Sequence, residues 1–122
     1  MAHAENHLIE LLPQPERQLL LARCESVHLE LSSVLCEVGQ PMRHAYFPVN
    51  GFISLITQVD KHPGLEVGMV GREGMVGAPL ALGALTSPLR ALVQGLPGVT
   101  SVFNRCLLPA PPRCRKVSHG PR

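Results

Sequence analysis

Four regularly spaced glycines are the most distinctive chemical feature of this sequence. Within E-V-G-M-V-G-R-E-G-M-V-G, residues 66–77, they stand at Gly68, Gly71, Gly74 and Gly77. Four glycines would destabilise a helix by about 3–4 kcal/mol relative to alanine, so the spacing predicts two short strands joined by a tight turn. A glycine backbone can also approach another group closely. Gly77 therefore either opens onto a ligand pocket or, like the other glycines, only serves a turn.

Residue types that catalyse reactions or bind metals are present, but their spacing indicates no such site. A metal-dependent double-sheet protein of the cupin type needs two or three histidines and a carboxylate around one ion, commonly as H-x-H on a strand. No two of the six histidines have this spacing, and His28 and His44 are expected to be outward-facing strand residues. Ser54 lies within a predicted strand and lacks a nucleophile-elbow context. We therefore expect no catalytic residue, no metal, no cofactor and no enzyme.

Cysteine spacing and the N-terminal residues indicate the compartment. The four cysteines, at positions 24, 36, 106 and 114, do not form the C-x2-C pairs of zinc or redox sites. The first ten residues contain Glu5 and Glu10 and no basic segment, which excludes a signal peptide, and no apolar run is long enough to span a membrane. We therefore predict a cytoplasmic protein without a membrane partner, whose cysteines are free thiols.

The charge of the chain is unevenly distributed. Residues 1–94 hold six basic and nine acidic side chains, whereas residues 95–122 hold five basic side chains, no acid and five of the twelve prolines. The first segment is therefore not a nucleic-acid-binding surface by charge. The basic segment is expected to touch polyanions without sequence preference, and to be largely disordered from Pro109 onward.

The pattern of the 122 residues predicts one mainly β domain. Residues 1–25 form a helical cover, in which Asn6 caps a first short helix and Pro15 lies in the first turn of a second. Residues 26–94 alternate between apolar and polar side chains in short runs separated by turns, among them the hairpin signal Asn50-Gly51. These runs predict an antiparallel double-sheet jelly roll. In the atypical tail, residues 95–122, only positions 99–108 are able to supply a further strand.

Several segments together resemble a known family. They are the runs Asn6-His7-Leu8, Gly39-Gln40-Pro41, Tyr46-Phe47-Pro48 before Asn50-Gly51-Phe52, and the glycine stretch 66–77. They resemble the N-terminal sensor domain of Crp/Fnr-type bacterial transcription regulators, over about residues 6–94. The resemblance implies a cyclic-nucleotide-binding-like antiparallel β-roll and a small anionic or nucleotide effector.

The same resemblance implies a ligand site, which this sequence keeps only in part. Relatives that bind cyclic nucleotide hold its phosphate and ribose with a glycine-glutamate turn and an arginine-serine pair. Gly77 matches the glycine and Arg90 the arginine, whereas Ala78 replaces the glutamate. Loss of a hydrogen-bonded acid lowers affinity by about ten- to a hundredfold. We expect Gly77, Ala78 and Arg90 to line the site, with the alternative that Arg90 is a solvated strand arginine.

The sequence departs from the family after residue 94. Neither a long dimerisation helix nor a helix-turn-helix fits residues 95–122, as though the gene were truncated or frameshifted there. We therefore expect no sequence-specific DNA binding by this chain, although full-length relatives bind DNA, and a weak homodimer or none. The alternatives to an effector-sensing domain are a ligand-free protein-interaction module and an inactive truncated gene product.

Overall fold

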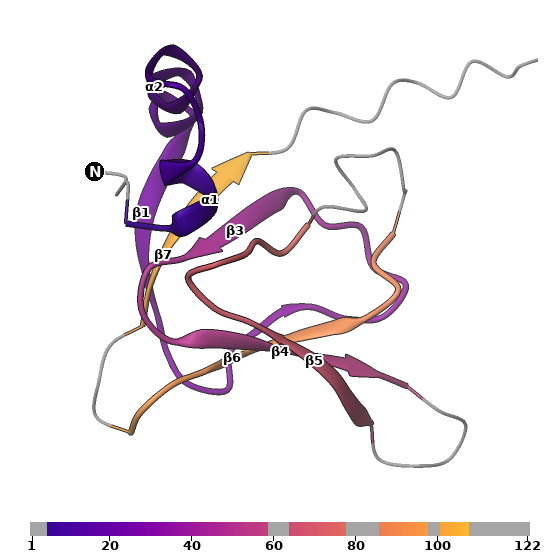
Figure 1. Ribbon diagram of the computed structural model, residues 1–122. Coiled ribbons are helices and arrows are strands. Elements are labelled where there is room, and N and C mark those ends of the chain that lie inside the picture. Colours follow the sequence, from indigo (N-terminus) through magenta and orange to yellow (C-terminus); the bar gives the residue numbers. More distant parts are fainter. Residues whose placement is uncertain (1–4, 59–63, 78–85, 98–100, 108–122) are drawn as a thin grey trace, which may run out of the picture.

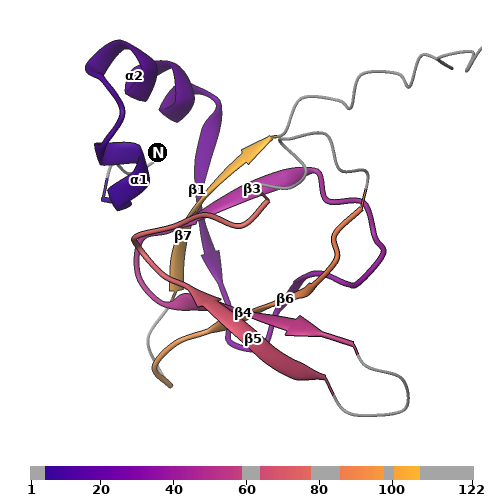
Figure 2. The same ribbon diagram turned by 45° about the vertical axis from the view of Figure 1, so that its right-hand side comes forward.

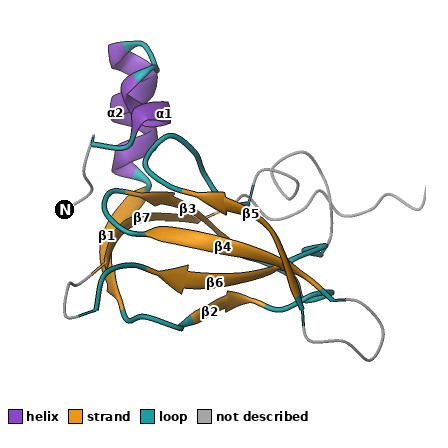
Figure 3. Ribbon diagram, turned by 60° about the horizontal axis from the view of Figure 1, so that its bottom comes forward, coloured by secondary structure: helices purple, strands orange, loops and turns teal. Residues whose placement is uncertain are grey.

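Two antiparallel β-sheets face each other in the computed structural model, which describes residues 5–58, 64–77, 86–97 and 101–107 (Figure 1). One sheet has the strand order β1 (Cys24–Leu29), β7 (Ser101–Leu107), β3 (His44–Pro48). The other has the order β2 (Val34–Cys36), β6 (Arg90–Gln94), β4 (Phe52–Thr57), β5 (Leu65–Val70), and its strands lie side by side in Figure 3. This arrangement confirms the predicted double-sheet β-roll.

The main hydrophobic core lies between the two sheets. Strand alternation sends every second side chain inward, so Ile53 of β4 and Val93 of β6, which pair directly, are both fully buried. Phe103 of β7 reaches the same core from the opposite sheet. Tyr46 is the other aromatic residue of this cluster, and the remaining buried members are Cys36, Met42, Val76 and Ala91.

A second, smaller core lies between the three-stranded sheet and the two N-terminal helices, α1 (His7–Glu10) and α2 (Gln14–Ala22) (Figure 2). Ile9 of α1 is fully buried there, against Phe47 of β3. The Asn6 side chain caps α1 by accepting hydrogen bonds from the N–H groups of residues 8 and 9. The predicted N-cap and helical cover are thus observed. No helix in the described ranges is long and apolar enough to cross a membrane.

Strand β7 lies beyond the predicted boundary of the β-roll at Gln94. It is the middle strand of its sheet, paired with β1 on one side and β3 on the other. Phe103 and Asn104 are fully buried. Buried and exposed side chains do not alternate regularly along these seven residues, so the sequence gives little indication of a strand. They form a strand because they pair with the two neighbouring strands. The β-roll therefore includes residues 101–107, which the sequence analysis placed in the tail.

The expectation of four free thiols is wrong for two of the cysteines. Cys24 of β1 lies directly opposite Cys106 of β7, with 4.1 Å between the Cα atoms, and the two form a disulfide. They are 82 residues apart in sequence, so their spacing along the chain does not reveal that strand pairing brings them together. Cys36 is a buried free thiol.

The turn at Asn50-Gly51 also differs from its prediction. It does not close a hairpin, because β3 and β4 belong to different sheets. Asn50 instead contacts β7, where its backbone N–H donates to the carbonyl of Val102 at 3.2 Å. Gly51 has a φ of +77°, as a turn residue of this kind requires, and leads the chain across to the second sheet. Residues 78–85 and the tail beyond Leu107 lie outside the described residues.

Candidate functional site

The corner that ends at Gly77 carries the chain from one sheet to the other. After β5, the N–H of Gly74 donates to the carbonyl of Gly71 at 3.1 Å and closes the predicted turn. Val76 then pairs with Tyr46 of β3 through two backbone hydrogen bonds of 2.9 Å. The first strand and the turn are thus as predicted, whereas the second predicted strand is a single bridge residue, Val76.

Gly77 is required by its conformation and by the closeness of β3. Its φ is +112°, a region that side chains disfavour. A Cβ at this position would lie 3.1 Å from the Cα of Ala45 and 3.4 Å from the carbonyl oxygen of His44. The close backbone approach expected here is thus an approach to β3. Ala78, the next predicted site residue, lies outside the described residues.

Arg90 begins β6 in the opposite sheet from the strand that Gly77 contacts. Its neighbours Ala91 and Val93 are buried between the sheets, so alternation places Arg90 on the other face of β6, with Leu92. Arg90 Nε lies 3.0 Å from Glu37 Oε1. The structure therefore gives Arg90 a carboxylate partner within the chain and places it on a different sheet from the Gly77 corner.

A surface groove opens beside this ion pair, at the end of the four-stranded sheet. Its volume is about 550 Å³. The end of β2, the end of β4, the residue before β5 and the start of β6 all contribute to its lining, which consists of Glu37, Val38, Ile56, Thr57, Gln58, Gly64 and Arg90. We call it the Glu37–Arg90 groove. Neither its extent nor the role of Glu37 is visible in the sequence, because the four segments meet only through strand pairing.

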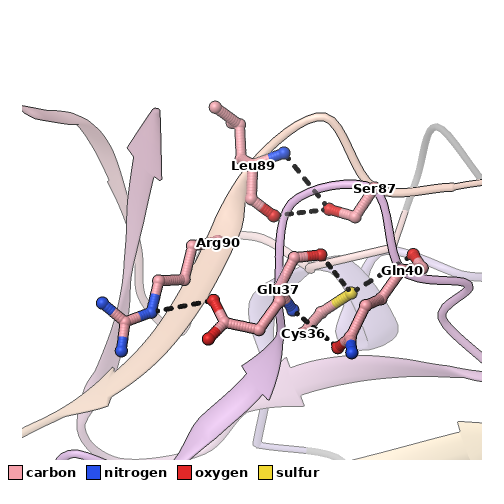
Figure 4. A network of polar contacts seen from close by, with 6 residues as sticks. All are labelled: Cys36, Glu37, Gln40, Ser87, Leu89 and Arg90. Carbon is pink, nitrogen blue, oxygen red and sulfur yellow. Dashed lines mark hydrogen bonds and ion pairs between the residues drawn. The ribbon is translucent and has the colours of Figure 1, made fainter. Parts of the chain in front are cut away.

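A network of hydrogen bonds holds the backbone around the two charged residues (Figure 4). On the β2 side, the N–H of Glu37 donates to Gln40 Oε1 at 3.3 Å, and the Cys36 thiol donates to the carbonyls of residues 37 and 40. On the β6 side, Ser87 and Leu89 form a turn through the Ser87 hydroxyl. Backbone hydrogen bonds from Gly39 to Ser87 and from Ser87 to Gln40 join the two sides. The ion pair is thus held by both segments.

Burial keeps the Cys36 thiol protonated. Desolvation raises its pKa, and the hydrogen bond with Ser87, which lowers the pKa, is the smaller effect. A raised pKa disfavours the thiolate, which is the nucleophilic form. Cys36 therefore acts here as a hydrogen-bond donor in the network rather than as a reactive group.

A second polar cluster, missed by the sequence analysis, lies on the three-stranded sheet. Arg105 of β7 is flanked by Glu25 of β1 and Tyr46 of β3, which are its direct partners in the strand register. Arg105 Nε donates to Glu25 Oε1 at 2.9 Å, and this hydrogen bond and the charge of Arg105 lower the pKa of Glu25. Desolvation raises the pKa of Tyr46, and it lowers that of nearby His44. Arg105 lies beyond the predicted boundary of the β-roll, so no sequence signal links these residues.

Comparison with known proteins identifies the fold. No protein-family model and no curated protein matches the sequence. Solved structures do match: a regulatory subunit of a cAMP-independent protein kinase A from Trypanosoma brucei has a TM-score of 0.72 and 14% identity over 85% of this chain. The sensor domain of the transcriptional regulator DNR from Pseudomonas aeruginosa has a TM-score of 0.67 and 18% identity over 85% of this chain and 67% of its own.

A cyclic nucleotide-binding-like protein from Brucella abortus matches with a TM-score of 0.63 and 24% identity, over 82% of each chain. This chain spans only 37% of the kinase regulatory subunit. The neighbours are regulatory and sensor proteins. The chain therefore has the cyclic-nucleotide-binding-like β-roll fold.

Proposed function

We propose that this chain is an effector-sensing domain of a Crp/Fnr-type transcription regulator. The observation that carries the proposal is the β-roll whose glycine corner crosses between the sheets and returns to β3 at Gly77. The sensor domain of the regulator DNR has the same fold. Two of the motifs that resemble this family have a defined role in the roll: Asn6 caps α1, and the glycine stretch forms backbone hydrogen bonds with β3.

In this proposal the effector is a small anionic molecule or nucleotide that binds near the turn beginning at Gly77. Ala78 supplies no carboxylate for a ribose hydroxyl, and Arg90 is already paired with Glu37. We therefore propose that cyclic AMP binds only weakly. The domain catalyses no reaction, does not itself recognise a DNA sequence, and forms at most a weak homodimer.

Titration of the nitrogen-15-labelled chain with cyclic AMP, cyclic GMP and inorganic phosphate tests this proposal. An effector of this class shifts the amide signal of Gly77, and Gly77→Ala reduces the response. The proposal is contradicted if none of the three probes shifts any signal in residues 70–77 at millimolar concentration. Cyclic AMP binding at micromolar affinity or tighter would contradict the weak binding proposed here.

The edge strand β5 supports a second candidate function, a protein-interaction module. Leu65, Val67 and Met69 of this strand are all more than half exposed. The order of the sheet leaves one side of β5 without a neighbouring strand among the described residues. Such edges are sites where another chain can pair. Self-association or pulldown that is lost in Val67→Lys, without loss of folding, would favour this candidate.

A further inference from the structure

We propose that the Glu37–Arg90 groove binds a small zwitterion of the α-amino acid type, which carries one ammonium and one carboxylate group. The inference does not depend on the regulatory role proposed above. Gly77 contacts β3 of the three-stranded sheet, whereas the groove lies at the end of the four-stranded sheet. The proposal rests on the charges of the groove, on its fixed geometry and on its lining.

Among the described residues that line the groove, positive and negative charges are equal in number. Its described lining contains one acid, Glu37, and one base, Arg90. A simple anion is attracted by Arg90 but repelled by Glu37, and a simple cation experiences the reverse. A molecule with one group of each sign is attracted by both residues through charge-assisted hydrogen bonds. Charge complementarity therefore selects a zwitterion over a singly charged ligand.

The ion pair leaves part of each charged group available. It joins Arg90 Nε to Glu37 Oε1, and the two side chains are 41% and 49% exposed. Figure 4 shows the terminal nitrogens of Arg90 pointing away from Glu37. A ligand carboxylate can accept hydrogen bonds from these nitrogens, while a ligand ammonium donates to Glu37 Oε2. The ligand carboxylate, Arg90, Glu37 and the ligand ammonium then alternate in charge, and the ion pair between Arg90 and Glu37 stays intact.

Hydrogen bonds hold the backbone on both sides of the ion pair. An exposed ion pair contributes little to folding. Nevertheless, Gln40 holds the backbone of Glu37, and the Ser87–Leu89 turn sets the entry to Arg90. Holding the backbone that carries the two charged side chains before binding reduces the conformational entropy lost when a ligand arrives. This arrangement suits recognition of a ligand.

The size and lining of the groove indicate the remainder of the ligand. A volume of about 550 Å³ lies in the range of small-molecule sites. Val38 and Ile56 supply apolar surface, while Thr57 and Gln58 supply a hydroxyl and an amide. The apolar surface of Val38 and Ile56 suits a branched apolar side chain, so L-leucine is the first probe.

The test is a titration of the full nitrogen-15-labelled chain with L-leucine at millimolar concentration. Isocaproate, which lacks the ammonium group of leucine, and isoamylamine, which lacks its carboxylate, serve as matched half-ligands. L-Leucine should shift the amide signals of Thr57, Gln58 and Gly64. Each half-ligand should bind at least about tenfold more weakly, because one charge-assisted contact is lost.

Single substitutions assign the contacts. Glu37→Gln and Arg90→Gln should each weaken L-leucine binding by about tenfold or more, whereas Glu30→Gln and Arg23→Gln, at exposed positions outside the groove, should not change it. Amide spectra of the variants establish whether they fold. If Arg90→Gln does not fold, the binding measurement on Glu37→Gln is sufficient to test the proposal. The proposal is overturned if L-leucine shifts no groove signal, if a half-ligand binds equally well, or if Glu37→Gln binds like the parent chain. Signals at Gly77 report separately on the regulatory proposal.

Discussion

Asn6 Nδ2 donates a hydrogen bond to the carbonyl of Gly74 at 2.9 Å, across 68 residues of sequence. The same amide nitrogen donates to the carbonyl of Pro48 at the end of β3, also at 2.9 Å. Its oxygen meanwhile caps α1. One fully buried side chain thus joins the N-terminal helix, the three-stranded sheet and the glycine corner that leads to Gly77.

Asn6→Ala should therefore destabilise the chain by about 2–4 kcal/mol, because it removes a helix cap and leaves the buried Pro48 carbonyl and the partly buried Gly74 carbonyl without this donor. Urea denaturation followed by circular dichroism measures the effect. Gln18→Ala, at an exposed position of α2, is the control and should change stability little. A loss below about 1 kcal/mol for Asn6→Ala would show that the three segments hold together without this side chain.

Comparison of Gly77→Ala with Gly39→Ala measures how much stability depends on the close contact between Gly77 and β3. Both glycines have positive φ, +112° and +80°, but a Cβ at Gly39 meets nothing within 4 Å, whereas one at Gly77 meets β3. Each variant should lose about 1 kcal/mol for the backbone conformation, and Gly77→Ala should lose about 1–2 kcal/mol more. Thermal or urea unfolding compares the two. Equal losses would mean that β3 yields to the added methyl group.

The disulfide predicts a redox-dependent stability. Cys24 and Cys106 close a loop across 82 residues, so its reduction should lower the free energy of unfolding by about 2–4 kcal/mol. Urea denaturation with and without dithiothreitol measures the difference. The double variant Cys24→Ser, Cys106→Ser should be insensitive to dithiothreitol. A thiol assay that finds both cysteines free in the purified, air-exposed protein would contradict the pairing.

The Glu25–Arg105 pair predicts a pH dependence. The folded-state pKa of Glu25 is lowered from its usual 4.5 by the hydrogen bond and the charge of Arg105. A carboxyl group whose pKa is lower in the folded state stabilises the fold above its unfolded pKa. That stabilisation is lost as the pH falls from 4.5 through the folded value. Carboxyl titration by NMR should show the low pKa, and Arg105→Gln should return it toward 4.5.

Glu16→Gln, on α2 and outside this pair, is the matched control for the pH experiment. Because Glu25 is exposed to solvent, added salt should reduce the pKa difference between the parent chain and Arg105→Gln. A Glu25 pKa that does not respond to Arg105→Gln would contradict the pairing across β1 and β7.

Local chemistry was sufficient to predict the elements of the β-roll. Alternation of apolar and polar residues indicated the strands that became β1, β2 and β6, and Asn6 and Pro15 marked the two helices. These signals can be recognised in the sequence because each depends only on residues within a few positions. The double-sheet class followed from the number of short strands and the turns between them.

Tertiary structure alone decided which strands pair and which side chains meet. Residues 101–107 form a central strand because β1 and β3 flank them, and the same pairing joins Cys24 to Cys106 and Glu25 to Arg105. The pairing of β2 with β6 likewise brings Arg90 to Glu37, in a different sheet from the strand that Gly77 contacts. Register between strands depends on the packing of both sheets at once, and contacts between residues more than fifty positions apart leave no periodic trace in a single sequence.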